Sequence, residues 1–198
     1  EPAKDNILFG APNFVATPHL GAATTEAQEN VALQVADQIS DYLLTGAVTN
    51  ALNTPSISAE EAPRLKPYAE LAEKLGLFAG QIADGGFTEI EIGFEGEPAQ
   101  LNTKPLTAAA VSGALRPIMS DVNMVSAPEI LKANGVTLTE ATRADSPVYD
   151  NLIRIRVKVD GAWRDVAGSI VAGVPKIVEV KGMALDAKFR PTILYVNN

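Results

Sequence analysis

Apolar residues recur every three to four positions near the start of the chain, which is the spacing of one face of an α-helix. The residues of this stripe are Ala27, Val31, Val35, Ile39 and Leu43. Thr25 and Gln28 are spaced as a capping-box pair, and Gly46 is suited to end the helix. Residues 13–17 form a short apolar segment that predicts a buried strand. One strand and one helix cannot bury each other's apolar faces, so we expect residues 1–53 to be a remnant of a larger α/β domain.

Three further helices are predicted beyond a linker rich in Ser, Thr, Asn and Pro. The first covers 67–82, with Pro67 in its first turn, where the missing N–H leaves no helical hydrogen bond unmade. The second covers 105–115. The third follows Ser126, which is expected to cap it, and ends at 134–135 (Asn-Gly).

From residue 87 onward, several segments alternate apolar and polar residues with the period of a β-strand. The predicted strands are 87–94, 152–159, 163–171, 176–180, 183–187 and 191–196. The pairs Asp160-Gly161 and Lys181-Gly182 lie between successive segments, as expected for tight hairpin turns. We therefore expect a mixed α+β fold in which a mixed sheet is flanked by helices.

Composition and charge restrict the partners and the environment of the chain. Its 198 residues carry a formal net charge of −8, which disfavours nucleic acid and anionic membrane surfaces as general partners. There is no cysteine and only one histidine, so neither a disulfide framework nor a transition-metal site is expected. No apolar run approaches the roughly 20 residues of a membrane span, and no signal peptide is expected. We expect a soluble cytoplasmic protein.

The single histidine, His19, lies in a loop whose composition suits a ligand site. Pro18 favours an extended backbone before it, and Gly21 allows a ligand to approach the main chain closely. The helix that begins after Thr24 offers free N–H groups that suit an anion. Histidine can exchange a proton near neutral pH, because its unperturbed pKa is about 6.5. A lone histidine is nevertheless more often structural or solvated, and these residues alone leave both interpretations open.

Residues 17–24 (Thr-Pro-His-Leu-Gly-Ala-Ala-Thr) and 26–28 (Glu-Ala-Gln) resemble the catalytic-histidine motif of the D-isomer-specific 2-hydroxyacid dehydrogenases. Four later stretches resemble the long form of the D-3-phosphoglycerate dehydrogenase family. They are 64–76, 105–109, 122–128 and 166–169. Together the blocks span nearly the whole chain, and their order is more specific than any one of them.

The resemblance implies an NAD-dependent dehydrogenase that oxidises 3-phosphoglycerate to 3-phosphohydroxypyruvate in L-serine biosynthesis. His19 would be the acid/base that exchanges a proton with the substrate oxygen during hydride transfer. The residues whose main chain would line the nicotinamide end of the cofactor are His19, Leu20, Gly21 and Ala22. The family's glutamate partner, substrate-binding arginine and glycine-rich NAD loop precede this motif, so this chain by itself is expected to be inactive.

The resemblance also implies a division into three parts. Residues 1–53 would be the C-terminal remnant of the catalytic region, 54–187 the intervening domain that binds an allosteric substrate, and 188–198 the first strand of a truncated ACT regulatory domain. The intervening domain would bind effectors and contact other subunits. The expected partners are 3-phosphoglycerate, a phosphorylated or serine-type effector, and further copies in a homo-oligomer.

A second candidate site is cationic. Lys176, Lys188 and Arg190 flank the passage into the expected ACT domain, where basic residues of the family bind a phosphorylated or carboxylate-bearing effector. Lys and Arg are the usual partners of phosphate and carboxylate. The match is partial, because Lys188 stands where an arginine would be expected, although Arg190 could substitute for it. Solvated charges at strand ends are an equally good interpretation.

Two other charged rows have simpler structural interpretations. The basic row is Arg154, Arg156, Lys158 and, across the hairpin, Arg164. Alternating charges of this kind mark a solvent-facing side or an ion-pair surface more often than an anion site. The acidic row is Glu89, Glu91, Glu95 and Glu97. It lacks the ligand spacing of a calcium loop, and we expect it to be a solvated edge.

Two classes of function therefore stay open. The chain is either part of an enzyme, as the motif at 17–24 implies, or a stand-alone effector-binding and assembly module without catalytic activity. If the chain is part of an enzyme, a substitution at His19 should greatly reduce the turnover of that enzyme. If it is an effector-binding module, it should bind anions.

Overall fold

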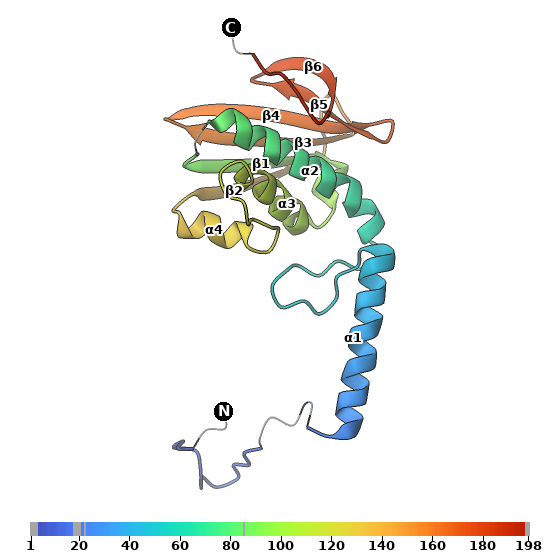
Figure 1. Ribbon diagram of the computed structural model, residues 1–198, viewed down its shortest axis with the longest axis vertical. Helices are drawn as coiled ribbons and strands as arrows, with labels where there is room; N and C mark the ends of the chain where they lie inside the picture. The colour runs from blue at the N-terminus through green and yellow to red at the C-terminus, as the bar shows by residue number, and fades with distance from the viewer. Residues whose placement is uncertain (1–3, 18–20, 22, 85, 197–198) are drawn as a thin grey trace. The chain divides into compact units, whose positions relative to one another are not determined.

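The computed structural model describes residues 4–17, 21, 23–84 and 86–196. The chain divides into two compact units, residues 1–44 and 45–198, which are described separately. The second unit contains one six-stranded sheet and the helices α2 to α4 (Figure 1). A mixed sheet with flanking helices is the predicted α+β class.

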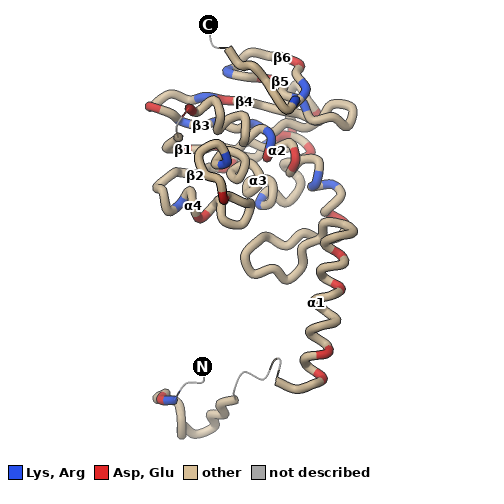
Figure 2. The backbone as a smooth tube through the Cα atoms, in the orientation of Figure 1, with Lys and Arg blue, Asp and Glu red and all other residues tan. Residues whose placement is uncertain are grey.

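Helix α1 (Thr25–Thr45) forms the C-terminal part of the first unit. The Thr24 side chain accepts a hydrogen bond from the Ala27 N–H at 3.1 Å, so Thr24 and not Thr25 caps the helix. Gly46, with φ at +80°, follows its last turn as predicted. No residue of α1 is buried, and Figure 2 shows acidic but no basic residues along it. Its apolar stripe is therefore exposed in this chain.

The predicted strand at 13–17 is wrong. These residues are exposed and belong to no strand, and Asn13 has a positive φ of 61°. A strand needs a neighbouring strand to accept and donate its backbone hydrogen bonds. The sheet ladders of the described residues include none that reaches this segment.

The sheet of the second unit has the strand order β2-β1-β3-β4-β5-β6. The strands are β1 (Glu89–Gly96), β2 (Thr137–Arg143), β3 (Asn151–Val159), β4 (Ala162–Val171), β5 (Val174–Val180) and β6 (Met183–Lys188). β1 and β2 are parallel, whereas every other neighbouring pair is antiparallel. The turns at Asp160-Gly161 and Lys181-Gly182 have positive φ at both residues, as the predicted hairpins require.

Helices α2 (Ala62–Ala83) and α3 (Thr103–Leu115) pack together, and α2 covers β3, β4 and β5 on one side of the sheet (Figure 1). The alternating apolar residues of the central strands point into this layer and are fully buried. They are Ile90, Ile92 and Phe94 on β1 and Ile153, Ile155 and Val157 on β3. The period-two pattern of the sequence thus correctly predicts the core side of the sheet.

Three glycines allow α2 and α3 to lie unusually close together. A Cβ added at Gly76 would lie 2.0 Å from the Ala110 carbonyl oxygen, and one at Gly113 would lie 2.1 Å from that of Glu73. Gly80 meets α3 in the same way, at 2.2 Å. The obstructing atoms belong to the backbone, so no side-chain movement could relieve the overlap.

The helix boundaries differ from those predicted at two places. α2 begins at Ala62, with Pro63 in its first turn, so Pro67 lies inside the helix and not at its start. α4 (Ala127–Ala133) ends as predicted, but the Ser126 side chain does not cap it. Instead Ser126 Oγ accepts a hydrogen bond from the Asn123 N–H at 3.2 Å and stabilises the preceding turn.

Two strand assignments also differ. The sequence does not predict β2, because this polar edge strand lacks the alternation of apolar residues seen in the other strands. Residues 191–196 were expected to be a strand, but they are extended without joining a ladder of the described residues. They contact the core through Tyr195. The assignment of 188–198 to an ACT domain stays a prediction.

Candidate functional site

The predicted catalytic histidine cannot be placed in a site. His19, Leu20 and Ala22 lie outside the described residues, and Gly21 occupies an exposed turn before α1. The loop therefore precedes the helix as expected, but its side-chain geometry is not part of the described structure. The roles assigned to these residues rest on the sequence motif alone.

The cationic residues lie in the second unit, which holds every Lys and Arg of the chain except Lys4 (Figure 2). Lys176 on β5 and Lys188, the last residue of β6, are direct partners in the β5–β6 ladder. The Lys176 ammonium contacts both carboxylate oxygens of Asp186, at 2.8 and 3.0 Å. No ion pair of Lys188 occurs among the residues that the structure describes. The antiparallel register therefore brings together two of the three predicted basic residues.

We call Lys176 and Lys188 the β5–β6 lysine pair. The two side chains differ in their exposure to solvent. The Lys176 side chain is only 17% exposed, whereas its partner Asp186 is 70% exposed. Lys188 is exposed at the end of its strand. Like charges directly opposite each other across a ladder repel, and a single carboxylate accompanies the two ammonium groups. The arrangement favours the arrival of a second anion.

Arg190 lies in a different setting, in a groove of about 680 Å³ between α2 and the C-terminal segment. Lys74 of α2 lines the same groove and lies 5.9 Å from the centre of the Phe189 ring. The Phe78 and Tyr195 rings meet edge to face at 6.1 Å. Arg190 thus follows the lysine pair in sequence but borders the aromatic contact with α2.

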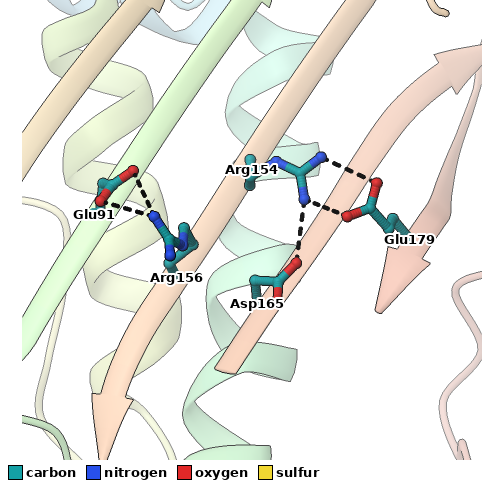
Figure 3. A network of polar contacts seen from close by, with 5 residues as sticks. All are labelled: Glu91, Arg154, Arg156, Asp165 and Glu179. Atoms are coloured by element: carbon teal, nitrogen blue, oxygen red, sulfur yellow. Dashed lines mark hydrogen bonds and ion pairs between the residues drawn. The ribbon is translucent and has the colours of Figure 1, made fainter. Parts of the chain in front are cut away.

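The basic row of β3 is paired with carboxylates on neighbouring strands. The Arg154 guanidinium binds Glu179 through two nitrogens, at 2.5 and 3.0 Å, and Asp165 at 3.1 Å (Figure 3). Arg156 lies 3.3 Å from both oxygens of Glu91. The hydrogen bond from Arg154 lowers the pKa of the Glu179 carboxyl, and the same bond raises the pKa of Arg154. These residues form an ion-pair lattice, as the structural interpretation predicts.

Half of the acidic row, Glu89 and Glu91, belongs to this lattice, so the row is not a solvated edge. β1 is an internal strand, so Glu89 and Glu91 face basic residues of β3 across the ladder. The other two members of the row pair elsewhere, Glu95 with Arg143 of β2 and Glu97 with Arg64 of α2. Lys158 binds Glu89 at 2.6 Å, and the Trp163 ring lies 4.7 Å from the Arg156 guanidinium. Arg164 does not belong to the row, because its guanidinium donates to the Ile82 carbonyl of α2.

Comparison with known proteins then gives the family. Residues 64–181 match the family model of the D-3-phosphoglycerate dehydrogenase intervening domain. The chain belongs to this family. The match runs from the first turn of α2 to the hairpin between β5 and β6, so it covers nearly all of the core described above.

Individual relatives of this intervening domain carry one name. A D-3-phosphoglycerate dehydrogenase of Bacillus subtilis is 35% identical over 202 residues, which cover 100% of this chain and 38% of that protein. The Methanocaldococcus jannaschii protein of the same name is 37% identical, with 92% and 35% covered. The Synechocystis protein is 33% identical, with 91% and 33% covered. This chain thus spans about a third of the length of the curated relatives it matches.

Sequence reasoning missed the carboxylate that accompanies the lysine pair in the intervening domain. Asp186 lies two residues before Lys188, and alternation along a strand places both on one side of the sheet. That spacing was a usable signal. No sequence signal indicates that Lys74 lies beside Phe189, because this contact depends on the packing of α2 against a segment more than a hundred residues away.

The described residues contain no group of three or more acidic, histidine or cysteine side chains that could hold a metal ion. Among the helices described, none has the length and apolar character needed to cross a membrane.

Proposed function

We propose that this intervening domain binds a small phosphorylated or carboxylate-bearing effector at the β5–β6 lysine pair. The observation that supports the proposal is the register that sets Lys176 opposite Lys188 with Asp186 as the accompanying carboxylate. An anion with two acidic groups, such as 3-phosphoglycerate, would add charge-assisted hydrogen bonds and reduce the repulsion between the lysines. Arg190 lines the separate groove against α2, so the proposal rests on Lys176 and Lys188 alone.

The parent enzyme would be a D-3-phosphoglycerate dehydrogenase of L-serine biosynthesis, as the names of the relatives suggest. NAD, when bound, supplies the hydride acceptor for oxidation of 3-phosphoglycerate. His19 would take the proton from the substrate hydroxyl and return it in the reverse direction. Within that enzyme the present chain would serve regulation and assembly, in the cytoplasm and in a homo-oligomer, with residues 188–198 opening an ACT domain.

The effector proposal is tested by the thermal midpoint of the chain in phosphate, 3-phosphoglycerate and L-serine. A ligand that binds only the native state raises the midpoint. We expect a rise with the phosphorylated ligands, and no rise when Lys188→Met removes half of the pair. Unchanged midpoints with all three ligands would refute the proposal.

The catalytic proposal needs a longer chain that includes the residues upstream of Glu1. His19→Ala in that enzyme should reduce the oxidation of 3-phosphoglycerate by about 10²–10⁴-fold, the usual contribution of a general acid/base. Retained turnover would show that the role assigned to His19 is wrong. The lysine-pair proposal does not depend on this outcome.

A further inference from the structure

A pocket of about 600 Å³ lies on another side of the intervening domain, between the 52–55 linker, α3, α4 and β2. None of the residues of the proposed effector site lines it. Two of the four stretches that carry the family resemblance form part of its wall. They contribute Thr107 and Ala108 from 105–109, and Met124, Val125 and Pro128 from 122–128. The size suits a small-molecule ligand.

The charged groups of the pocket have mixed signs. Lys104 of α3, Glu129 of α4 and Glu140 of β2 all line it, and no salt bridge involves any of them in the described part of the chain. The Glu140 carboxylate accepts a hydrogen bond from the Thr103 hydroxyl at 3.2 Å, which fixes it beside the first residue of α3. One ammonium and two carboxylates therefore surround the pocket without neutralising one another in ion pairs.

Apart from Asn53 and Thr54, the remaining wall is mostly apolar and partly open to solvent. Leu52 in the linker is fully exposed, and Met124 and Val125 are 37% and 40% exposed. Pro55 and Leu138 complete this side of the pocket. Covering these side chains would remove apolar surface from water, which favours binding of a ligand with an apolar portion.

We propose that this pocket binds an α-amino acid with an apolar side chain. The ligand's ammonium group lies at Glu140 and Glu129, its carboxylate lies at Lys104, and its side chain covers Leu52 and Met124. A purely anionic ligand such as inorganic phosphate would be repelled by the two glutamates, and a simple amine would leave Lys104 unpaired. The site is thus distinct in chemistry from the lysine pair.

Isothermal titration of the chain with L-leucine, at up to about 10 mM to cover weak binding, tests the proposal. Two analogues separate the charges: 4-methylpentanoate lacks the ammonium group, and 3-methylbutylamine lacks the carboxylate. We expect measurable binding of L-leucine and at least about tenfold weaker binding of both analogues, the loss of one charge-assisted interaction. L-Serine should also bind more weakly, because it cannot cover the apolar wall.

Variants locate the binding. Lys104→Met and Glu140→Gln should each weaken L-leucine binding by about tenfold or more. Lys66→Met, an exposed lysine of α2 outside the pocket, is the matched control and should bind normally. Absence of L-leucine binding, equal binding of the analogues or of L-serine, or normal binding by Lys104→Met would each overturn the proposal. Loss of phosphate binding at the lysine pair would not affect this result.

Discussion

Arg154 binds Glu179 through two guanidinium nitrogens, with Nη1–Oε1 at 2.5 Å and Nη2–Oε2 at 3.0 Å. The pair links β3 to β5 across the intervening strand β4, where Asp165 accepts a further bond from Arg154. All three side chains are less than a third exposed. A planar guanidinium can bind Glu179 through two nitrogens while it also bonds Asp165, whereas a lysine has no planar fork for the bidentate contact.

Removal of Arg154 should therefore be costly. Arg154→Met leaves two half-buried carboxylates without their cation, and we expect a loss of about 1–3 kcal/mol in the free energy of unfolding, reduced from the fully buried case by solvent screening. Arg154→Lys should recover only part of the lost stability. Urea unfolding at neutral pH measures the unfolding free energy of both variants. Lys158→Met, which breaks the more exposed pair with Glu89, is the control and should cost less than about 1 kcal/mol.

The Glu179 pair also predicts a pH dependence. Because the hydrogen bond from Arg154 lowers the pKa of Glu179 in the folded chain, the unfolded state binds its proton first as the pH falls. The stability from this carboxylate is present above the unfolded pKa of about 4.3 and is lost as the pH drops through the folded value. The difference in unfolding free energy between wild type and Glu179→Gln should thus shrink below about pH 4. A constant difference down to strong acid would contradict this.

Tyr68 predicts a loss of stability at high pH, opposite in sign to the effect of Glu179. Burial, together with the 2.7 Å hydrogen bond to Glu97, raises the pKa of the Tyr68 hydroxyl. The stability that the Tyr68 hydroxyl contributes is fully present below the unfolded pKa of about 10 and decreases at higher pH. Tyr68→Phe should cost about 1 kcal/mol at neutral pH, and it should make the alkaline loss of stability less steep. Ultraviolet titration of the tyrosines should show one group fewer that resists ionisation.

The close contact between α2 and α3 predicts a sharp difference between two glycines. Gly113→Ala would place a Cβ about 2.1 Å from the Glu73 carbonyl oxygen, so the helices must separate. We expect a loss of about 3 kcal/mol or more, at the upper end of overpacked cores. Gly93→Ala meets its nearest atom at 3.7 Å and is the control. It should change the unfolding free energy by less than about 1 kcal/mol. Similar losses at both positions would contradict the close-contact account.

The sequence predicts the elements whose signals are local. Alternation identifies the buried side of β1 and β3, and positive-φ turn residues locate the hairpin at Asp160-Gly161. It fails where a partner decides the outcome: 13–17 has no neighbouring strand among the described residues, and the polar edge strand β2 depends on pairing with β1.

The same distinction applies to the candidate site. The family resemblance made Lys176, Lys188 and Arg190 candidates because they flank the passage into the expected ACT domain. Only the β5–β6 register sets Lys176 opposite Lys188 and adds Asp186. The acidic row was misinterpreted as an edge for a related reason. Strand order, which determines whether β1 is internal, results from the whole sheet and is not contained in any one segment.

The thermal midpoint of the chain with 3-phosphoglycerate, compared between wild type and Lys188→Met, tests the central proposal most directly. At a ligand concentration about tenfold above the dissociation constant, binding contributes about 1.4 kcal/mol, which raises the midpoint by about 3–6 °C. We predict that rise for wild type and for the Lys66→Met control, and no rise for Lys188→Met. Without ligand, Lys188→Met should be at least as stable as wild type, because it removes the charge opposite Lys176. An equal rise in Lys188→Met and wild type would contradict the account.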